Sequence, residues 1–277
     1  MPDAAMEHRS IDRHASSCMN AELILMSMVP ATYLVMLAVE ARFPARRFPA
    51  VAWWRVLGAL ALVLLMGIGV VTPLLLPLDW LARHRLIDAT GLGVVPGALV
   101  GYLVVAFLGF VWHRALHRVP LLWRTFHQMH HAPRRLDLSS AAIFHPLDLV
   151  MFNVVQVGGL TLLLGLDPLA AGIVGYVATF GSLFQHWNVR TPRFVGWFLQ
   201  RPEAHCVHHQ LGVHAGNYSD VPVFDMLIGT YANPAAFDGA VGFDRPAPVL
   251  DMLRFVDVHA GDHSTTTVAV IAQPETE

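Results

Sequence analysis

Histidines crowd the middle of this 277-residue sequence: eleven of its sixteen fall between His113 and His214. Two stretches share one H-x-x-H-H frame, HQMHH at 127–131 and HCVHH at 205–209. A third cluster, WHRALH, places His113 and His117 four residues apart. On a helix, residues three or four apart lie on one face with side chains about 5–6 Å apart. This spacing suits several imidazole nitrogens on one metal ion.

Metal binding explains this density better than packing does. A lone pair of histidines is more often a surface or core feature, but eight neutral imidazoles pressed together leave nitrogens unpaired, at roughly 1–3 kcal/mol each. Protonated imidazoles would instead bring like charges together. Eight nitrogens also exceed the four ligands of a tetrahedral zinc site, so the clusters predict two metal ions with open positions. Imidazole alone does not choose between iron, zinc, copper and nickel.

The composition predicts a membrane protein. Hydrophobic residues make up 55% of the chain, charged residues 14%, and the mean hydropathy is +0.51, whereas soluble domains carry about 25% charged residues. Five runs approach the roughly 20 apolar residues that span a bilayer as a helix, at about 23–38, 56–78, 89–112, 147–166 and 168–184. Buried core helices are the alternative, but the runs hold almost no charge. We therefore predict an all-α, polytopic membrane bundle of four to five spans, with a helical cap that holds the dimetal site.

The remaining segments and the orientation follow from polarity. Residues 1–20 form a predicted polar N-terminal tail without a cleaved signal peptide, residues 21–242 the membrane domain, and residues 243–277 a flexible tail. Arg-rich stretches at 42–47, 114–135 and 190–201 belong on the cytoplasmic side by the positive-inside rule. Five spans then place the cap and every histidine cluster at the cytoplasmic face, which we predict to be that of a bacterial inner membrane.

Charge and cysteine content exclude other classes of protein. The net charge of −2 argues against a nucleic-acid partner. Two cysteines are too few for a disulfide framework, and we take Cys206, inside HCVHH, as a small filler. The sequence contains no H-E-x-x-H protease motif, no G-x-S-x-G elbow and no phosphate-binding glycine loop.

The set WHRALH, HQMHH and HCVHH, in this order and spacing, resembles the fatty acid hydroxylase/sterol desaturase superfamily of membrane di-iron enzymes. The similarity runs from about Gly109 to Tyr231 and includes QHWN and HAGNYSDVPVFDMLIGTY. The resemblance implies two non-haem irons, O2 as co-substrate, an external electron donor, and hydroxylation or desaturation of a sterol, hopanoid, fatty acyl or other lipid. The implied iron ligands are His113, His117, His127, His130, His131, His205, His208 and His209, with His145 and His186 as further ligands. It also implies site roles for Asn217 and Asp225.

The chain departs from relatives at several positions. Ile143 stands where relatives often have arginine, Asp148 where glutamate is common, and the apolar AFLGFVW where an acidic residue is frequent. No His-Pro-Gly-Gly occurs, so a fused cytochrome b5 domain is not expected. The expected electron donor is a separate ferredoxin, cytochrome or reductase. Within HQMHH, Gln128 and Met129 are expected to be free to vary.

Two other functions fit parts of the pattern. A zinc-dependent membrane hydrolase would use the same histidines and work without O2. A non-catalytic metal-binding or metal-transporting membrane protein should carry histidines or acids within its spans. Between residues 23 and 111 the sole histidine is His84, in a predicted loop with Asp79 and Asp88, which gives transport little support.

Overall fold

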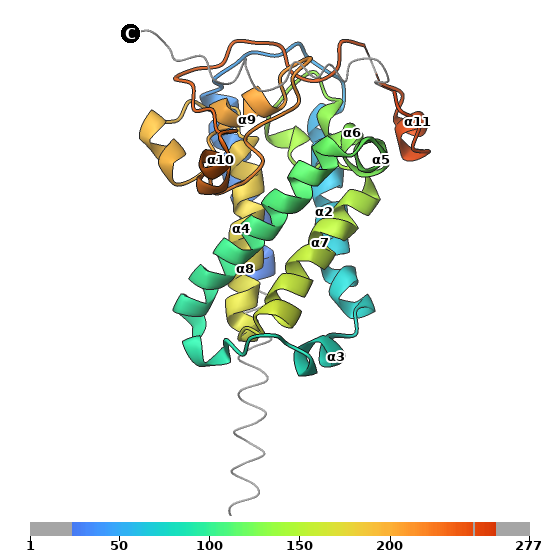
Figure 1. Cartoon of the computed structure of the whole chain (residues 1–277). Coiled ribbons are helices and arrows are strands. Elements are labelled where there is room, and N and C mark those ends of the chain that lie inside the picture. The colour runs from blue at the N-terminus through green and yellow to red at the C-terminus, as the bar shows by residue number, and fades with distance from the viewer. Residues whose placement is uncertain (1–23, 246, 259–277) are drawn as a thin grey trace, which may run out of the picture.

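Helices and loops make up the described part of the chain, residues 24–245 and 247–258 of a computed structural model (Figure 1). The long helices are Ile24–Arg42, α2 (Trp54–Leu75), α4 (Val94–Arg118), α7 (Pro146–Gly158) and α8 (Pro168–Gln185). The short helices are α3 (Leu78–Arg83), α5 (Pro120–Leu122), α6 (Gln128–His131), α9 (Pro202–His208), α10 (Val223–Ile228) and α11 (Val249–Leu253). The remaining turns are η1 (Thr90–Leu92), η2 (Trp123–His127), η3 (Leu138–Ser140), η4 (Gly159–Leu163) and η5 (Arg193–Trp197). Within the described ranges no strand forms, so the all-α prediction is confirmed.

Five of these helices are long and apolar enough to cross a membrane: Ile24–Arg42, Trp54–Leu75, Val94–Arg118, Pro146–Leu163 and Pro168–Gln185. The chain is therefore an integral membrane protein. The third of them differs most from its predicted range of 89–112. It begins after Gly93, whose φ of 71° interrupts the preceding turn, and it continues through WHRALHR. His113 and His117 thus belong to the spanning helix itself.

Small residues allow the helices of the bundle to approach closely. A Cβ on Gly101 of α4 would lie 2.5 Å from Leu166 and 3.0 Å from Val174, the latter on α8. Close contact through small residues is a common way for membrane helices to pack, because lipid supplies no hydrophobic drive between them. On another face of α4, Leu99 and Leu103 are 65% and 51% exposed, so this face is directed toward lipid.

The two ends of the bundle are unequal. In Figure 1, α5, α6, α9, α10 and α11 gather at the upper end as a cap, while α3 and the connection between α7 and α8 lie at the lower end. The cap end collects the three histidine clusters and the three Arg-rich stretches. The structure thus confirms a helical cap, and the side of the membrane that it faces stays a prediction.

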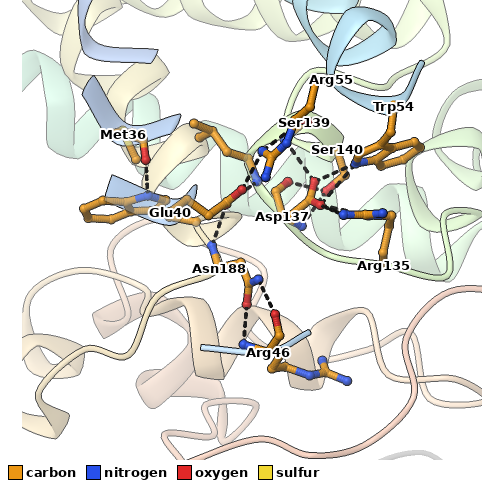
Figure 2. Close-up of polar contacts among 12 residues, drawn as sticks. Met36, Glu40, Arg46, Trp54, Arg55, Arg135, Asp137, Ser139, Ser140 and Asn188 are labelled. Atoms are coloured by element: carbon orange, nitrogen blue, oxygen red, sulfur yellow. Dashed lines mark hydrogen bonds and ion pairs between the residues drawn. The ribbon is translucent and has the colours of Figure 1, made fainter. Parts of the chain in front are cut away.

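A buried carboxylate joins the cap to the bundle (Figure 2). Glu40 is 1% exposed, and its Oε1 pairs with the Arg55 guanidinium at 2.6 Å. Its Oε2 accepts hydrogen bonds from the backbone N–H groups of Leu138 at 2.8 Å and Asn188 at 3.0 Å. The Asn188 side chain in turn donates to and accepts from the Arg46 backbone. One acid thus holds together the first helix, α2, the η3 loop and the segment after α8.

A second acid fixes the loop that follows HQMHH (Figure 2). Asp137 accepts from the Trp54 indole at 2.9 Å, from the Arg135 guanidinium at 2.8 Å and from the Ser139 backbone at 3.0 Å. Gly58 lets this loop lie directly on α2, because a Cβ there would be 2.6 Å from the Cβ of Ser139. These contacts anchor the loop between α6 and α7.

Part of the predicted C-terminal tail packs against the cap. Phe243 is 2% exposed and lies 6.3 Å from the Trp123 ring, and α11 follows it. The Gln128 amide donates to Val256 O at 2.7 Å and accepts from Val258 N at 3.3 Å. Gln128 is therefore a buried clamp, and the prediction that it is free to vary is wrong. Five helical residues are too few to give a periodic signal in the sequence. The predicted N-terminal tail and residues 259–277 lie outside the described residues.

Replacing Glu40 by alanine should destabilise the protein by about 3 kcal/mol, because two buried N–H groups would lose their acceptor at roughly 1–3 kcal/mol each. The melting temperature of the purified protein in detergent should fall by roughly 5–10 °C. Asp79→Ala, which removes an exposed acid from α3, should leave it unchanged. Equal melting temperatures for the two variants would show that the Glu40 junction does not hold the cap.

Candidate metal centre

The structure brings nine histidines together in two adjoining groups at the cap end of the bundle. Group 1 contains His113, His117, His127, His131 and His208, and group 2 contains His130, His186, His205 and His209. Within each group, one ring nitrogen of every member lies within 4.8 Å of the others. The rings of His131 and His209 stack at 4.0 Å across the boundary, so the groups are direct neighbours.

Each H-x-x-H-H frame is divided between the groups. In the first frame His127 and His131 enter group 1 and His130 enters group 2. The second frame does the reverse, with His205 and His209 in group 2 and His208 in group 1. In each frame the histidines at i and i+4 thus share a group, and the histidine at i+3 belongs to the other group. The prediction that the two frames together supply ligands to two metal ions is consistent with this geometry.

Five elements carry the nine side chains, counting the residues that cap them. The C-terminal turns of α4 supply His113 and His117, and His186 ends α8. The π-helical turn η2 leads into α6 across the first frame. Wide turns of this kind occur often at functional sites. The second frame lies on α9, where Pro202 at the first position favours a helical start.

Backbone carbonyls fix the protonation of several rings. A carbonyl oxygen can only accept, so an Nδ1 that contacts one carries the proton and leaves Nε2 with a free lone pair. Such contacts join His113 to Tyr218 O (2.7 Å), His130 to Ile143 O (3.2 Å), His186 to Ser182 O (2.7 Å) and His208 to Gly216 O (2.6 Å). The Ile143 contact uses the backbone, so the missing arginine there does not disturb it.

A carboxylate performs the same task for His127. Asp148 is fully buried, and its Oδ2 lies 2.8 Å from His127 Nδ1. A carboxylate on the outer nitrogen of a metal-binding histidine fixes the ring and makes it a stronger ligand. Asp148 therefore acts here as the orienting acid, although the sequence alone showed it only as a replacement for glutamate.

In two pairs of grouped histidines the Nε2 atoms face each other, and neither Nε2 carries a proton. His113 and His127 approach at 2.9 Å between their Nε2 atoms in group 1, and His130 and His186 at 3.1 Å in group 2. In both pairs each Nδ1 holds the proton, so two lone pairs face each other. The buried Nε2 of His131 and of His208 have no hydrogen-bond partner. A cation in each group would turn these repulsions into bonds, so the residues present fit two metal ions.

Electrostatics keep the rings neutral and able to bind. Burial, followed by the neighbouring imidazoles, holds the pKa of His127, His131 and His209 well below the usual range. Burial lowers the pKa of His186 to about 4. At neutral pH these nitrogens therefore offer lone pairs, which is the form that binds metal.

His145 lies outside both groups. Its Nδ1 accepts from Leu147 N at 3.2 Å and caps α7, and its ring lies 5.3 Å from Phe255. Its prediction as a ligand is therefore not supported by its position. The His-Pro pair instead starts a helix, with proline at the first helical position.

Asn217 and Asp225 hold backbone in place rather than entering a group. The Asn217 amide donates to Ala204 O at 2.8 Å, directly before His205, and its φ of 49° is left-handed. Asp225 accepts from Ser219 N at 2.9 Å and from the Thr230 hydroxyl at 2.6 Å, and burial raises its pKa. Asn217 thus positions the start of the second frame, and Asp225 holds the backbone next to Tyr218, whose carbonyl accepts from His113.

Two further partners of the histidines were missed by sequence reasoning. Gln200 contacts His205 Nδ1 at 2.7 Å, and His214 contacts His131 Nδ1 at 3.1 Å. His214 follows the second frame by five residues, which is a weak signal. Gln200 lies in a loop, and nothing in the sequence near it marks its role.

Comparison with known proteins identifies the family. The fatty acid hydroxylase family model matches residues 98–230, which include every grouped histidine. The cholesterol 25-hydroxylase-like protein of Danio rerio is 30% identical over 203 residues, 68% of this chain and 77% of that protein. Human cholesterol 25-hydroxylase is 29% identical over 133 residues, which are 44% of this chain and 46% of that protein. Sphingolipid C4-hydroxylase sur2 of Schizosaccharomyces pombe is 26% identical over 138 residues, which are 48% of this chain and 47% of that protein. No solved structure matches the chain. The chain belongs to the fatty acid hydroxylase family, as its histidine clusters indicated.

Removing a grouped histidine should remove metal, whereas removing His145 should not. We expect two metal ions per chain in the wild type and about one in His131→Ala, because that variant loses a buried Nε2 from group 1. His145→Ala should keep both. The measurement is metal content by mass spectrometry after dialysis against a weak chelator. Equal losses in the two variants would place His145 among the ligands after all.

Asp148→Asn should retain the shape of the site but weaken it, because the amide lacks the charge that strengthens His127. We expect metal to be held 10–100-fold less tightly, the usual effect of losing such a partner. Competition with a coloured chelator measures this. Asp167→Asn is the matched control, since Asp167 caps α8 at the far end of the bundle. Unchanged affinity in Asp148→Asn would refute the orienting role.

Proposed function

We propose that this protein is a membrane-bound, O2-dependent di-iron enzyme that hydroxylates or desaturates a C–H position of a membrane lipid. The observation that carries this proposal is the pair of histidine groups whose unprotonated Nε2 atoms converge at the end of the spanning helices. The relatives reported above are named hydroxylases of cholesterol and sphingolipid, which favours hydroxylation.

The donor set favours iron over zinc. Structural and catalytic zinc sites use three or four protein ligands in a tetrahedron. Group 1, with five nitrogens, exceeds this number, while group 2, with four, does not. A metal that accepts six ligands keeps open positions in both groups. When bound, two irons supply the reductive activation of O2 that attack on an unactivated C–H requires.

The protein's own residues hold and protect this centre. Asp148 and the backbone carbonyls keep protons on the Nδ1 atoms, so that the Nε2 atoms stay directed inward. Phe144 stacks on His130 at 3.9 Å, and Trp123 lies 5.1 Å from both His117 and His131. These rings cover the histidines and exclude water, which limits side reactions of activated oxygen.

The substrate class follows from where the site lies. His113 and His117 are on a spanning helix, so we place the site near the level of the lipid rather than out in the solvent. A sterol, hopanoid, fatty acyl chain or related lipid could present a carbon there without leaving the membrane. The protein would set the position of that carbon by contacts with the rest of the lipid.

Hydroxylation consumes two electrons and two protons for each O2, with one oxygen atom entering the lipid and the other leaving as water. We propose a separate ferredoxin, cytochrome or reductase as the donor. The exposed arginines Arg118, Arg124 and Arg134 near the histidine-bearing turns suit an acidic docking surface. We propose that this face lies on the cytoplasmic side of a bacterial inner membrane, in keeping with the positive-inside rule.

Reconstitution separates this proposal from its alternatives. The iron-loaded protein, in bilayers made from extracted membrane lipids, is given a chemical reductant, electron carrier and 18O2. We expect a hydroxylated lipid that carries the heavy oxygen, and none from His209→Ala. A zinc hydrolase would act without O2 and take its oxygen from water. A non-catalytic metal protein would bind two irons and leave the lipid unchanged, and either result would overturn the proposal.

A further inference from the structure

The cap carries an exposed apolar surface that lies outside the spanning helices. It consists of Phe194, Trp197 and Phe198 in and after η5, and Val223, Leu227 and Ile228 on α10, which we call the apolar ledge. Phe198 and Leu227 are 72% and 77% exposed. Exposed apolar patches of this kind usually mark a contact with a partner or a membrane.

Hydrogen bonds make the ledge one unit. The Tyr231 hydroxyl, just after α10, donates to Gly196 O within η5. Arg193 and Asn233 exchange two further bonds, each 3.1 Å long, between side chain and backbone. The two halves of the ledge therefore keep a fixed position relative to each other.

The ledge continues the lipid-facing surface of α4. Phe224 of α10 packs against Phe107 and Phe110 of α4, with ring centroids 5.4 and 5.8 Å apart. Phe107 is 47% exposed and lies on the same face as Leu103 and Leu99. Phe107 thus joins the exposed face of this spanning helix to α10.

The point of contact lies at the depth of lipid chains. Phe107 is eleven residues before Arg118, the last residue of α4, which corresponds to about 16 Å at 1.5 Å per residue. The whole helix of 25 residues is about 37 Å long, against about 30 Å of hydrocarbon. Even if all of the roughly 7 Å by which the helix exceeds the hydrocarbon thickness lay at the cap end, Phe107 would remain within the bilayer.

The charges beside the ledge suit an interface with lipid. Arg190 is exposed and precedes η5, and Arg193 begins it. Aromatic side chains next to arginines are typical of protein segments at the level of lipid headgroups, where the guanidinium reaches phosphate and the ring reaches the chains. A water-soluble protein partner would not need a surface continuous with the lipid-facing side of α4.

We propose that the apolar ledge is inserted among the acyl chains of the leaflet that the cap covers. The cap is then seated in the membrane. His113 lies six residues beyond Phe107, about 9 Å further along α4, so the histidine groups stand just above the seated ledge. Given the proposed function, a lipid substrate would reach them sideways from this leaflet.

Spin labels test whether the apolar ledge is inserted in the membrane, and the test does not depend on enzyme activity. Phe198→Cys and Leu227→Cys are labelled with a nitroxide in a Cys18→Ser background, in nanodiscs of neutral and anionic phospholipid. Cys206 stays unlabelled because it is buried and burial raises its thiol pKa to about 12. Leu103→Cys on α4 is the lipid control, and Ala236→Cys in an exposed cap loop is the water control. Collision rates with O2 and with a water-soluble nickel complex are compared.

We expect both ledge labels to behave as Leu103→Cys does, with high O2 and low nickel collision rates. A nickel collision rate equal to that of Ala236→Cys would contradict the insertion of the ledge. Shielding from both reagents would also contradict it and would indicate that a second copy or another protein covers the ledge. As a second measure, brominated acyl chains should quench the part of the tryptophan emission that Trp197→Phe removes. Loss of enzyme activity would leave all these outcomes unchanged.

Discussion

The close approach of unprotonated imidazole nitrogens is the constraint on which the rest of the structure depends. His113 faces His127 and His130 faces His186 at about hydrogen-bond distance, yet the single proton of each ring is on Nδ1, where it is donated to an oxygen on the outer side of the group. Seven of the nine grouped rings are buried, and a cation in each group would relieve the repulsion between the facing lone pairs. The carbonyls and Asp148 that hold the outer nitrogens matter as much as the rings, because they decide which nitrogen is free.

The fold serves this constraint by bringing distant segments to one end of a membrane bundle. Helices α4 and α8 pack side by side through small residues and carry His117 and His186 at their cap ends, and the cap adds α6 and α9. Glu40 and Asp137 tie the connecting loops to the tops of the first two spanning helices, so the cap cannot shift without breaking buried hydrogen bonds. The apolar ledge then sets the level of this whole assembly in the leaflet.

The sequence predicted what local patterns determine. Long apolar runs gave the spanning helices, and the i, i+4 spacing gave eight of the nine grouped histidines, with His186 added by resemblance. It could not predict how each frame divides between two groups, because that depends on how α6 and α9 face each other. It overestimated His145, whose His-Pro pair makes a helix cap, and it missed the clamp made by Gln128. The division of the frames and the role of Gln128 depend on contacts from far along the chain, whereas the His145 cap is a local bond to Leu147 N.

The central claim is that each histidine group holds one metal ion. Diffraction from iron-loaded crystals, recorded on both sides of the iron absorption edge, tests it most directly. The account predicts two anomalous peaks per chain, one among His113, His117, His127, His131 and His208 and the other among His130, His186, His205 and His209. A single peak, or peaks that lie outside these groups, would contradict it.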